Sequence, residues 1–281
     1  MVLQREPAAA KLWGWGIPGT DVRVTAGDTV LQATVDRVTA SWSVTLPPQK
    51  AGPAFGTGEI TLETTFANAS KNIKVVLTDM SYGEVWMCTG QSNMGLPLSA
   101  IGSGPSGGDP LTSWSGDVSY GAAEIANASA YPNIRVVQQQ MVSIPDPTDH
   151  AQTSGGWFKP APTNMGGFSA VCWMFGRRLQ AELGVPVGLI QIEVGGTAVE
   201  RWSSTDALAK CDQTRGPDKL ALCKSSITPS DEALQYTRFG LDPHEHALSG
   251  PGGVNSTLFN GMINPWIGTA VKGAIWCVDM A

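Results

Sequence analysis

The sequence of 281 residues has little charge: Asp, Glu, Lys and Arg make up 15% of it, and the formal net charge is −6. It has no block of Lys and Arg that could displace counterions from phosphates, which argues against a nucleic-acid partner. Charge, proline or glycine interrupts every apolar run well short of the roughly 20 residues of a membrane helix, so no membrane span is expected. Hydrophobic residues (42%) and 10 Trp instead indicate a folded chain with a sizeable core.

Cysteine and histidine are also scarce, at five and three residues. Five cysteines are too few for a disulfide scaffold, and no CxxC spacing suggests zinc. Cys211 and Cys223 bracket a polar loop, and they either form a local disulfide in a secreted protein or remain ordinary thiols. The sequence leaves both readings open.

The signals for a cellular compartment disagree with one another. The first ten residues, MVLQREPAAA, have no apolar segment of the kind a signal peptide needs. Asn68, Asn127 and Asn255 nevertheless lie in N-x-S/T sequons, which are glycosylation sites in secreted proteins. Together with frequent Trp, Gly and Pro, these sequons favour an extracellular or lysosomal glycoprotein.

The pattern of apolar residues changes near residue 80. Residues 1–80 contain short stretches in which apolar residues alternate with polar ones, which predicts a small antiparallel β domain with one buried face. The alternating residues are Val22, Val24, Trp42, Val44, Leu46, Ile60, Leu62, Phe66, Ile73, Val75 and Leu77.

Residues 81–281 instead predict an α/β layer with a parallel sheet, because continuous apolar runs alternate with helical patterns. The predicted buried strands are 85–88 and 187–194, and 271–277 is a third apolar strand. Residues 134–137 are strand-like within a loop-rich stretch, a short helix is expected near 257–263, and 203–255 is expected to be irregular. Ser169 is the expected N-cap of a helix over 170–183 that Gly184 ends. Phe175, Leu179 and Leu183 are expected to form its apolar face.

Two turns follow predicted strands at the sheet edge where open α/β folds bind ligands. In Gly90-Gln91-Ser92-Asn93-Met94, Ser92 is either an exposed nucleophile or a helix N-cap serine in a tight turn. Met94 stands where the G-x-S-x-G elbow of α/β-hydrolases has its second Gly. Gly195-Gly196-Thr197 either offers N–H groups to an anion or is a plain turn.

Residues 83–94 closely resemble the nucleophile block of the sialate O-acetylesterase family of SGNH hydrolases. Other blocks follow in the family's order, which is far more specific than any single one. They are 1–5, 13–16, 169–178, 188–190, 195–197, 200–202 and 259–263. The resemblance implies an SGNH-hydrolase-like (flavodoxin-like) α/β domain with a parallel sheet, preceded by the antiparallel β domain.

The resemblance also implies an activity, the removal of O-acetyl groups from sialic acids without a cofactor. Ser92 would attack the acetyl carbonyl, a His would take its proton, and an Asp would orient the His. The Ser92 N–H and the N–H of Gly196, or else of Gly195, would hold the oxyanion. Gln91 and Asn93 belong to the motif and would brace the turn. The implied location is secreted or lysosomal.

The match breaks after Trp276. The family continues there into a Tyr-Gln-Gly-Glu-Ser-Asn segment with the third oxyanion donor, and much later into an Asp-x-His-Pro block, whereas this sequence reads Cys277–Ala281. We therefore expect an incomplete hydrolase domain, from a truncated product or an incomplete gene model, that lacks its later strands and its catalytic Asp and His. Met1 matches an internal methionine of the family, so a clipped N-terminus is expected as well.

His244 is the first candidate for a substitute base, since Asp242-Pro243-His244 superficially resembles Asp-x-His. It precedes the 259–263 block, in the wrong order, so surface histidines are the better reading of His244, His246 and His150. Two other functions remain open: a carbohydrate acetylesterase for acetylated polysaccharides, and a glycan-binding fragment without catalysis.

Overall fold

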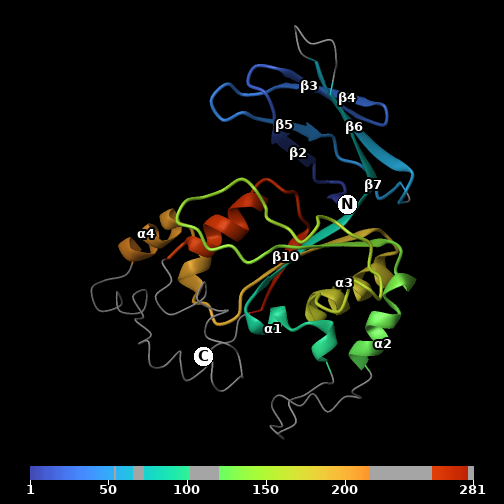
Figure 1. Ribbon diagram of the computed structural model, residues 1–281, viewed down its shortest axis with the longest axis vertical. Helices are drawn as coiled ribbons and strands as arrows, with labels where there is room; N and C mark the ends of the chain where they lie inside the picture. Colours follow the sequence, from blue (N-terminus) through green and yellow to red (C-terminus); the bar gives the residue numbers. More distant parts are fainter. Residues whose placement is uncertain (54, 66–72, 102–119, 215–254, 278–281) are drawn as a thin grey trace, which may run out of the picture.

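The computed structural model describes residues 1–53, 55–65, 73–101, 120–214 and 255–277, and its sheets form two regions along one long strand (Figure 1). The strands of the main sheet are β1 (Val2–Gln4), β3 (Asp21–Ala26), β4 (Thr29–Thr34), β6 (Gly58–Thr65), β7 (Ile73–Gly90), β8 (Ile134–Gln138), β9 (Val187–Glu193) and β10 (Gly273–Cys277). A separate two-stranded sheet pairs β2 (Ala10–Trp15) with β5 (Ser41–Leu46).

Strand β7 belongs to both regions. Its first part pairs antiparallel with β6, from Ile73 opposite Thr64 to Met80 opposite Gly58. Its last part pairs parallel with β9 on one side and β10 on the other, and β8 continues the parallel sheet beyond β9. The predicted fold class, a parallel α/β sheet preceded by antiparallel strands, is confirmed. The predicted domain boundary at residue 80 falls within β7, which runs through it unbroken. The division of the chain into two domains there stays a prediction.

Most of the predicted alternation in the antiparallel region is confirmed. In β5, Trp42, Val44 and Leu46 are buried while the residues between them are not. The start of β7 differs, since Ile73 is 55% exposed and Val75 is 46% exposed. Alternation shows that two faces exist, but whether a face is covered depends on the other elements. Phe66 lies outside the described residues.

Helix α3 (Ala170–Leu183) begins and ends as predicted, and its predicted apolar face is confirmed in part, because Phe175 and Leu179 are partly buried and pack against the core. The Ser169 Oγ accepts a hydrogen bond from the Cys172 N–H at 3.1 Å, and Gly184 ends the helix with a φ of +64°. The buried residues are Ala170, Cys172, Trp173 and Gly176, whereas Leu183 is 45% exposed. A Cβ on Gly176 would come within 2.4 Å of Leu189 in β9, so this glycine sets the packing face.

A second difference concerns the predicted irregular stretch after residue 203. Helix α4 (Thr205–Thr214) begins there, and Ser204 caps it by accepting the Ala207 N–H at 3.2 Å. The other described helical segments are α1 (Ser92–Gly95), η1 (Leu98–Ala100), α2 (Tyr120–Ala126), η2 (Ala128–Ala130), η3 (Val199–Trp202), η5 (Phe259–Ile263) and η6 (Asn264–Trp266). None of the helices in the described ranges is long and apolar enough to cross a membrane.

A disulfide joins the strand to the helix in the core of the parallel region. Cys88 in β7 and Cys172 in α3 are fully buried, lie 84 residues apart and have sulfur atoms 2.01 Å apart. The sequence left open whether Cys211 and Cys223 form a second disulfide, and the Cys211 side chain and Cys223 lie outside the described residues. The disulfide therefore joins the end of β7 to helix α3.

Candidate active site

Ser92 lies at the carboxyl end of β7, on the first residue of the four-residue helix α1. The backbone reaches it through Gly90, whose φ is +140°, and through Gln91 in an extended conformation. Ser92 is exposed, while Met94 two residues later is 1% exposed. The buried Met94 side chain therefore anchors the turn and leaves the serine facing solvent.

The turn after β9 lies directly beside Ser92. Gly90 pairs with Glu193 in parallel register, so both turns leave the same edge of the sheet. A Cβ on Gly195 would be 3.4 Å from the Ser92 Cβ and 3.7 Å from the Ser92 N. Gly196 follows, exposed and with a φ of +68°. The structure thus brings Ser92 and the Gly195–Gly196 turn together, although sequence separates them by more than 100 residues.

Gln91 connects the two turns. Its Nε2 donates to the carbonyl oxygen of Thr197, and its backbone N–H donates to the carbonyl of Cys277 at 2.9 Å. Thr197 is in turn held by its Oγ1, which donates to the Val194 carbonyl at 2.8 Å and accepts from Trp202 Nε1 at 2.8 Å. These bonds limit movement of the glycine turn relative to Ser92. Asn93 is exposed on α1.

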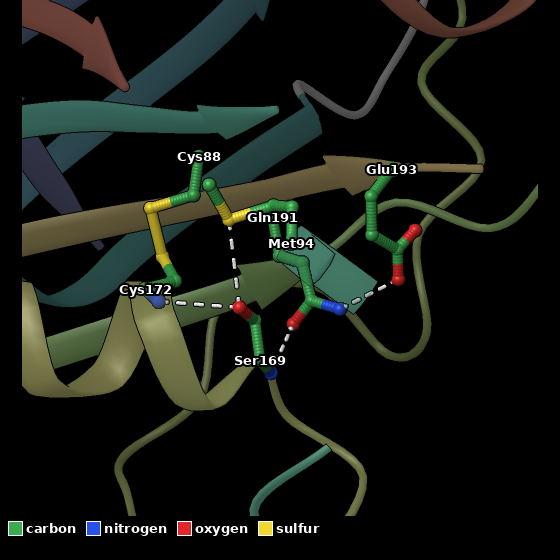
Figure 2. Close-up of a disulfide and its surroundings, with 6 residues drawn as sticks. All are labelled: Cys88, Met94, Ser169, Cys172, Gln191 and Glu193. Carbon is green, nitrogen blue, oxygen red and sulfur yellow. Dashed lines mark hydrogen bonds between the residues drawn. A yellow bond between two sulfur atoms is a disulfide. The ribbon is translucent and has the colours of Figure 1, made fainter. Parts of the chain in front are cut away.

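A buried polar chain supports the Ser92 turn from within the core (Figure 2). The side-chain oxygen of Gln191 accepts the backbone N–H of Ser169 at 2.8 Å, and its Nε2 donates to Glu193 Oε1 at 2.8 Å. The Ser169 hydroxyl contacts the Met94 sulfur at 3.5 Å. Gln191 and Ser169 are 1% and 0% exposed, so hydrogen bonding inside the protein replaces the water they lose.

Glu193 is the one ionisable group that the chain places against α1 from β9. A Cβ on Gly95 would be 3.3 Å from the Glu193 Cγ and 3.5 Å from its Oε1. Burial raises the pKa of the Glu193 carboxyl, and the hydrogen bond from Gln191 opposes that rise. Sequence reasoning missed this residue, although a Glu at the end of an otherwise apolar strand beside two glycines was a visible signal.

The histidines do not complete a triad in the described part of the chain. His150 is exposed and stacks on Trp15 of β2, with ring centroids 3.8 Å apart, and is thus part of a different surface. His244 and His246 lie outside the described residues. Within the described ranges, no group of three or more His, Cys, Asp or Glu could hold a metal ion.

Two of the three predicted sequons lie in the described ranges. Asn127 follows α2 and Asn255 precedes η5, and both are exposed. Asn68 lies outside the described residues.

The chain is similar to known proteins over nearly its whole length. The sialate O-acetylesterase of Rattus norvegicus is 31% identical over 298 aligned positions, covering 98% of this chain and 49% of that protein. The sialate O-acetylesterase of Homo sapiens is also 31% identical and covers 98% of this chain and 46% of that protein. The predicted resemblance is thereby confirmed, and the chain spans about half the length of these curated relatives.

A solved structure agrees in fold. A carbohydrate acetylesterase from Xanthomonas citri superposes with a TM-score of 0.67 at 23% identity, over 99% of this chain and 48% of that one. This confirms the SGNH-hydrolase-like fold class with its antiparallel β region. No family model matches the sequence.

Proposed function

We propose that this chain supplies the nucleophile side of a serine acetylesterase that removes O-acetyl groups from sialic acids. The observation that supports it best is the exposed Ser92, held at the carboxyl end of β7 against Gly195. The relatives named sialate O-acetylesterase support the substrate class.

In the proposed reaction, the Ser92 Oγ attacks the acetyl carbonyl carbon and loses its proton to a base. The oxyanion that forms would accept hydrogen bonds from the Ser92 N–H and from the Gly196 or Gly195 N–H. Collapse of this intermediate expels the sugar oxygen, which takes the proton, and leaves an acetyl-serine. Water then hydrolyses the acetyl-serine to acetate and restores Ser92.

The base is the open part of the proposal. The described residues offer no His beside Ser92, and the sequence has no match for the family's Asp-x-His-Pro block. Removing the base of a triad lowers turnover by roughly a millionfold, which leaves only the contribution of oxyanion and binding groups. We therefore expect this chain by itself to release acetate very slowly.

Labelling with a fluorophosphonate tests the nucleophile and the base together. Full-length chain is compared with Ser92→Ala and with Ser99→Ala, which removes another exposed hydroxyl in η1. Weak labelling of wild type that is absent in Ser92→Ala and unchanged in Ser99→Ala is expected. Labelling that persists in Ser92→Ala would contradict the nucleophile, and rapid labelling would contradict the missing base.

Acetylated polysaccharide is the second candidate substrate, because the Xanthomonas citri structure is described as a carbohydrate acetylesterase. Acetate release from 9-O-acetyl-N-acetylneuraminic acid and from acetylated xylan separates the two. Faster release from xylan would favour the second candidate. If the chain binds sugar, releases acetate from neither substrate and is not labelled at Ser92 by the fluorophosphonate, a glycan-binding fragment would be favoured.

We further propose a secreted or lysosomal location. The buried Cys88–Cys172 disulfide supports an oxidising compartment, and the exposed Asn127 and Asn255 are accessible to glycosylation. A mobility shift after N-glycosidase treatment of protein from secreting cells is expected. If no mobility shift is seen and Cys88 and Cys172 are reduced in the same protein, the proposed location would be contradicted.

A further inference from the structure

A groove of about 660 Å³ lies on the open face of the β2–β5 sheet, away from the Ser92 turn. Its floor is this sheet, with Trp13, Trp15 and Ser41 among the lining residues. Asp149 lines it from the loop that follows β8, and Asn264 lines it from the start of η6. Figure 1 shows β2 and β5 beside these segments, with α1 at the opposite end of the parallel sheet. The groove is thus distinct from the candidate active site.

The sheet turns its tryptophans outward. Trp13 pairs with Ser43 and Trp15 with Ser41, so these four side chains share one face. The other face is buried core, where Leu12 and its neighbours pack. Trp15 is 41% exposed and Trp13 is half-buried. Alternation would usually place polar residues on the outer face, whereas the exposed indole of Trp15 and the half-buried indole of Trp13 leave apolar area in water there, at a cost in solvation.

A neighbouring ring holds one of these indoles in position. His150 lies on the loop that follows β8 and stacks on Trp15, with ring centroids 3.8 Å apart and ring planes 22° apart. Such a contact restricts the rotamers of Trp15 before any ligand arrives. A ligand that packs against the exposed part of this ring would therefore lose less entropy on binding.

Polar groups surround the indoles. Asp36 is fixed in a turn, where its Oδ1 accepts from the N–H groups of Val38 and Thr39, both at 2.8 Å. Asp149 is exposed, and Asn264 is oriented by its Nδ2, which donates to the Thr148 carbonyl at 2.9 Å. An apolar floor with a few positioned polar groups is the usual composition of a small-ligand site.

The charges of the groove select among ligands. Asp36 and Asp149 place two carboxylates on its lining, against one ammonium group from Lys11. This balance disfavours an anionic ligand, including a sialic acid carboxylate. It suits hydroxyl groups, which can donate to carboxylate and amide oxygens.

We propose that this groove binds a neutral saccharide, with a pyranose ring packed on Trp15 and Trp13. The C–H groups on one face of such a ring carry slight positive charge and are attracted to the negative face of an indole. The equatorial hydroxyls would donate to Asp149 and Asp36 at the margin. The groove would thus hold a glycan chain independently of ester chemistry at Ser92.

Calorimetric titration of the full chain with xylohexaose, cellohexaose and lacto-N-tetraose tests this. At least one of these neutral sugars should bind saturably, and N-acetylneuraminic acid should bind more weakly. Trp15→Ala should raise the Kd about tenfold, which corresponds to about 1.4 kcal/mol, while Trp15→Phe should lose less. Asp149→Asn, an exposed change that leaves the sheet intact, should raise it about threefold.

Two controls separate this site from the other one. Leu183→Ala removes an exposed apolar side chain from α3, and Ser92→Ala disables the proposed nucleophile. Both should keep the wild-type Kd. The proposal is overturned if none of the three sugars binds, if Trp15→Ala and Asp149→Asn both bind as wild type does, or if tetramethylammonium binds in preference to the sugars.

Discussion

Gly90 of β7 lies against the backbone of Cys277 in β10. A Cβ on Gly90 would be 1.9 Å from the Cys277 carbonyl oxygen and 2.7 Å from its carbonyl carbon. The same oxygen accepts the Gln91 N–H at 2.9 Å. The last strand therefore determines where β7 ends and where the Ser92 turn begins.

The first prediction follows from this contact. Gly90→Ala should destabilise the protein by about 3 kcal/mol or more, because the methyl group overlaps a backbone carbonyl and the φ of +140° is unfavourable for alanine. Gly167→Ala is the matched control, with no atom within 4 Å of its new Cβ, and should change stability by less than about 0.5 kcal/mol. Urea unfolding measures both, and equal stabilities of the two variants would contradict the contact.

The second prediction concerns the disulfide between Cys88 and Cys172. Replacing both with alanine should cost about 2–4 kcal/mol of unfolding free energy, because the bond closes a long loop and both residues are buried. Cys277→Ala, which removes a free and partly buried thiol, should cost less than about 1 kcal/mol. Peptide mapping without reduction should recover the 88–172 pair, and recovery of either cysteine in another pairing would refute it.

The third prediction is a dependence of stability on pH through Glu193. Burial raises its pKa in the folded protein above the ordinary value, so the folded state holds this proton more tightly than the unfolded state does. Its contribution is favourable below the ordinary glutamate pKa and is lost as pH rises through the raised value. Glu193→Gln keeps an oxygen that accepts the hydrogen bond from Gln191, but it carries no titrating proton. As pH rises through the raised pKa, the wild type should therefore lose stability relative to this variant.

Unfolding by urea at a series of pH values between about 4 and 8 measures this difference. The exposed Glu182→Gln in α3 is the control for loss of one carboxylate. A difference between wild type and Glu193→Gln that stays constant across this range would show that the Glu193 carboxyl is not desolvated.

The fourth prediction concerns the ion pair where the two regions meet. Arg135 of β8 is buried and donates to both carboxylate oxygens of Asp79, at 2.6 and 2.7 Å. The hydrogen bond from Arg135 lowers the pKa of Asp79, so the stabilisation is present above the ordinary aspartate pKa and is lost as pH falls through the lowered value. Asp79→Asn should therefore cost about 1–3 kcal/mol at neutral pH, with half-exposure of Asp79 reducing the effect.

Lys74→Gln is the comparison for this variant. Its pair with Glu63 spans 3.9 Å between exposed groups and should be worth less than about 0.5 kcal/mol. Asn also keeps the backbone of residue 79, whose φ of +52° it tolerates. Thermal unfolding that ranks Lys74→Gln as the more damaging change would contradict the assigned role of Arg135.

Features with a local cause could be predicted from the sequence. The Ser169 cap and the Gly184 end of α3 depend on the residues next to them, and both are in the structure as predicted. The apolar runs that became β8 and β9 were also recognisable, since burial on both faces leaves no polar alternation. The turn that presents Ser92 could be placed because it follows such a run.

Features that depend on residues far apart in the chain could not be predicted from the sequence. Leu183 was assigned to the apolar face of α3 and is exposed, because the helix packs closely on β9 at Gly176, beside Leu189. The Cys88–Cys172 pair has no spacing signal, because 84 residues separate its members. Glu193 looked like the polar end of a strand until its packing beside α1 was visible.

By itself, the sequence determined the apolar runs of β8 and β9, the caps of α3 and the serine that follows β7 as nucleophile candidate. These depend on side-chain periodicity and on hydrogen bonds between near neighbours, which the sequence contains directly. Only the tertiary structure decided that Gly195 lies against Ser92, that Glu193 is partly desolvated and that His150 stacks on Trp15. Each of these depends on how separate segments pack, and packing is set by the shape of the whole core rather than by any one segment.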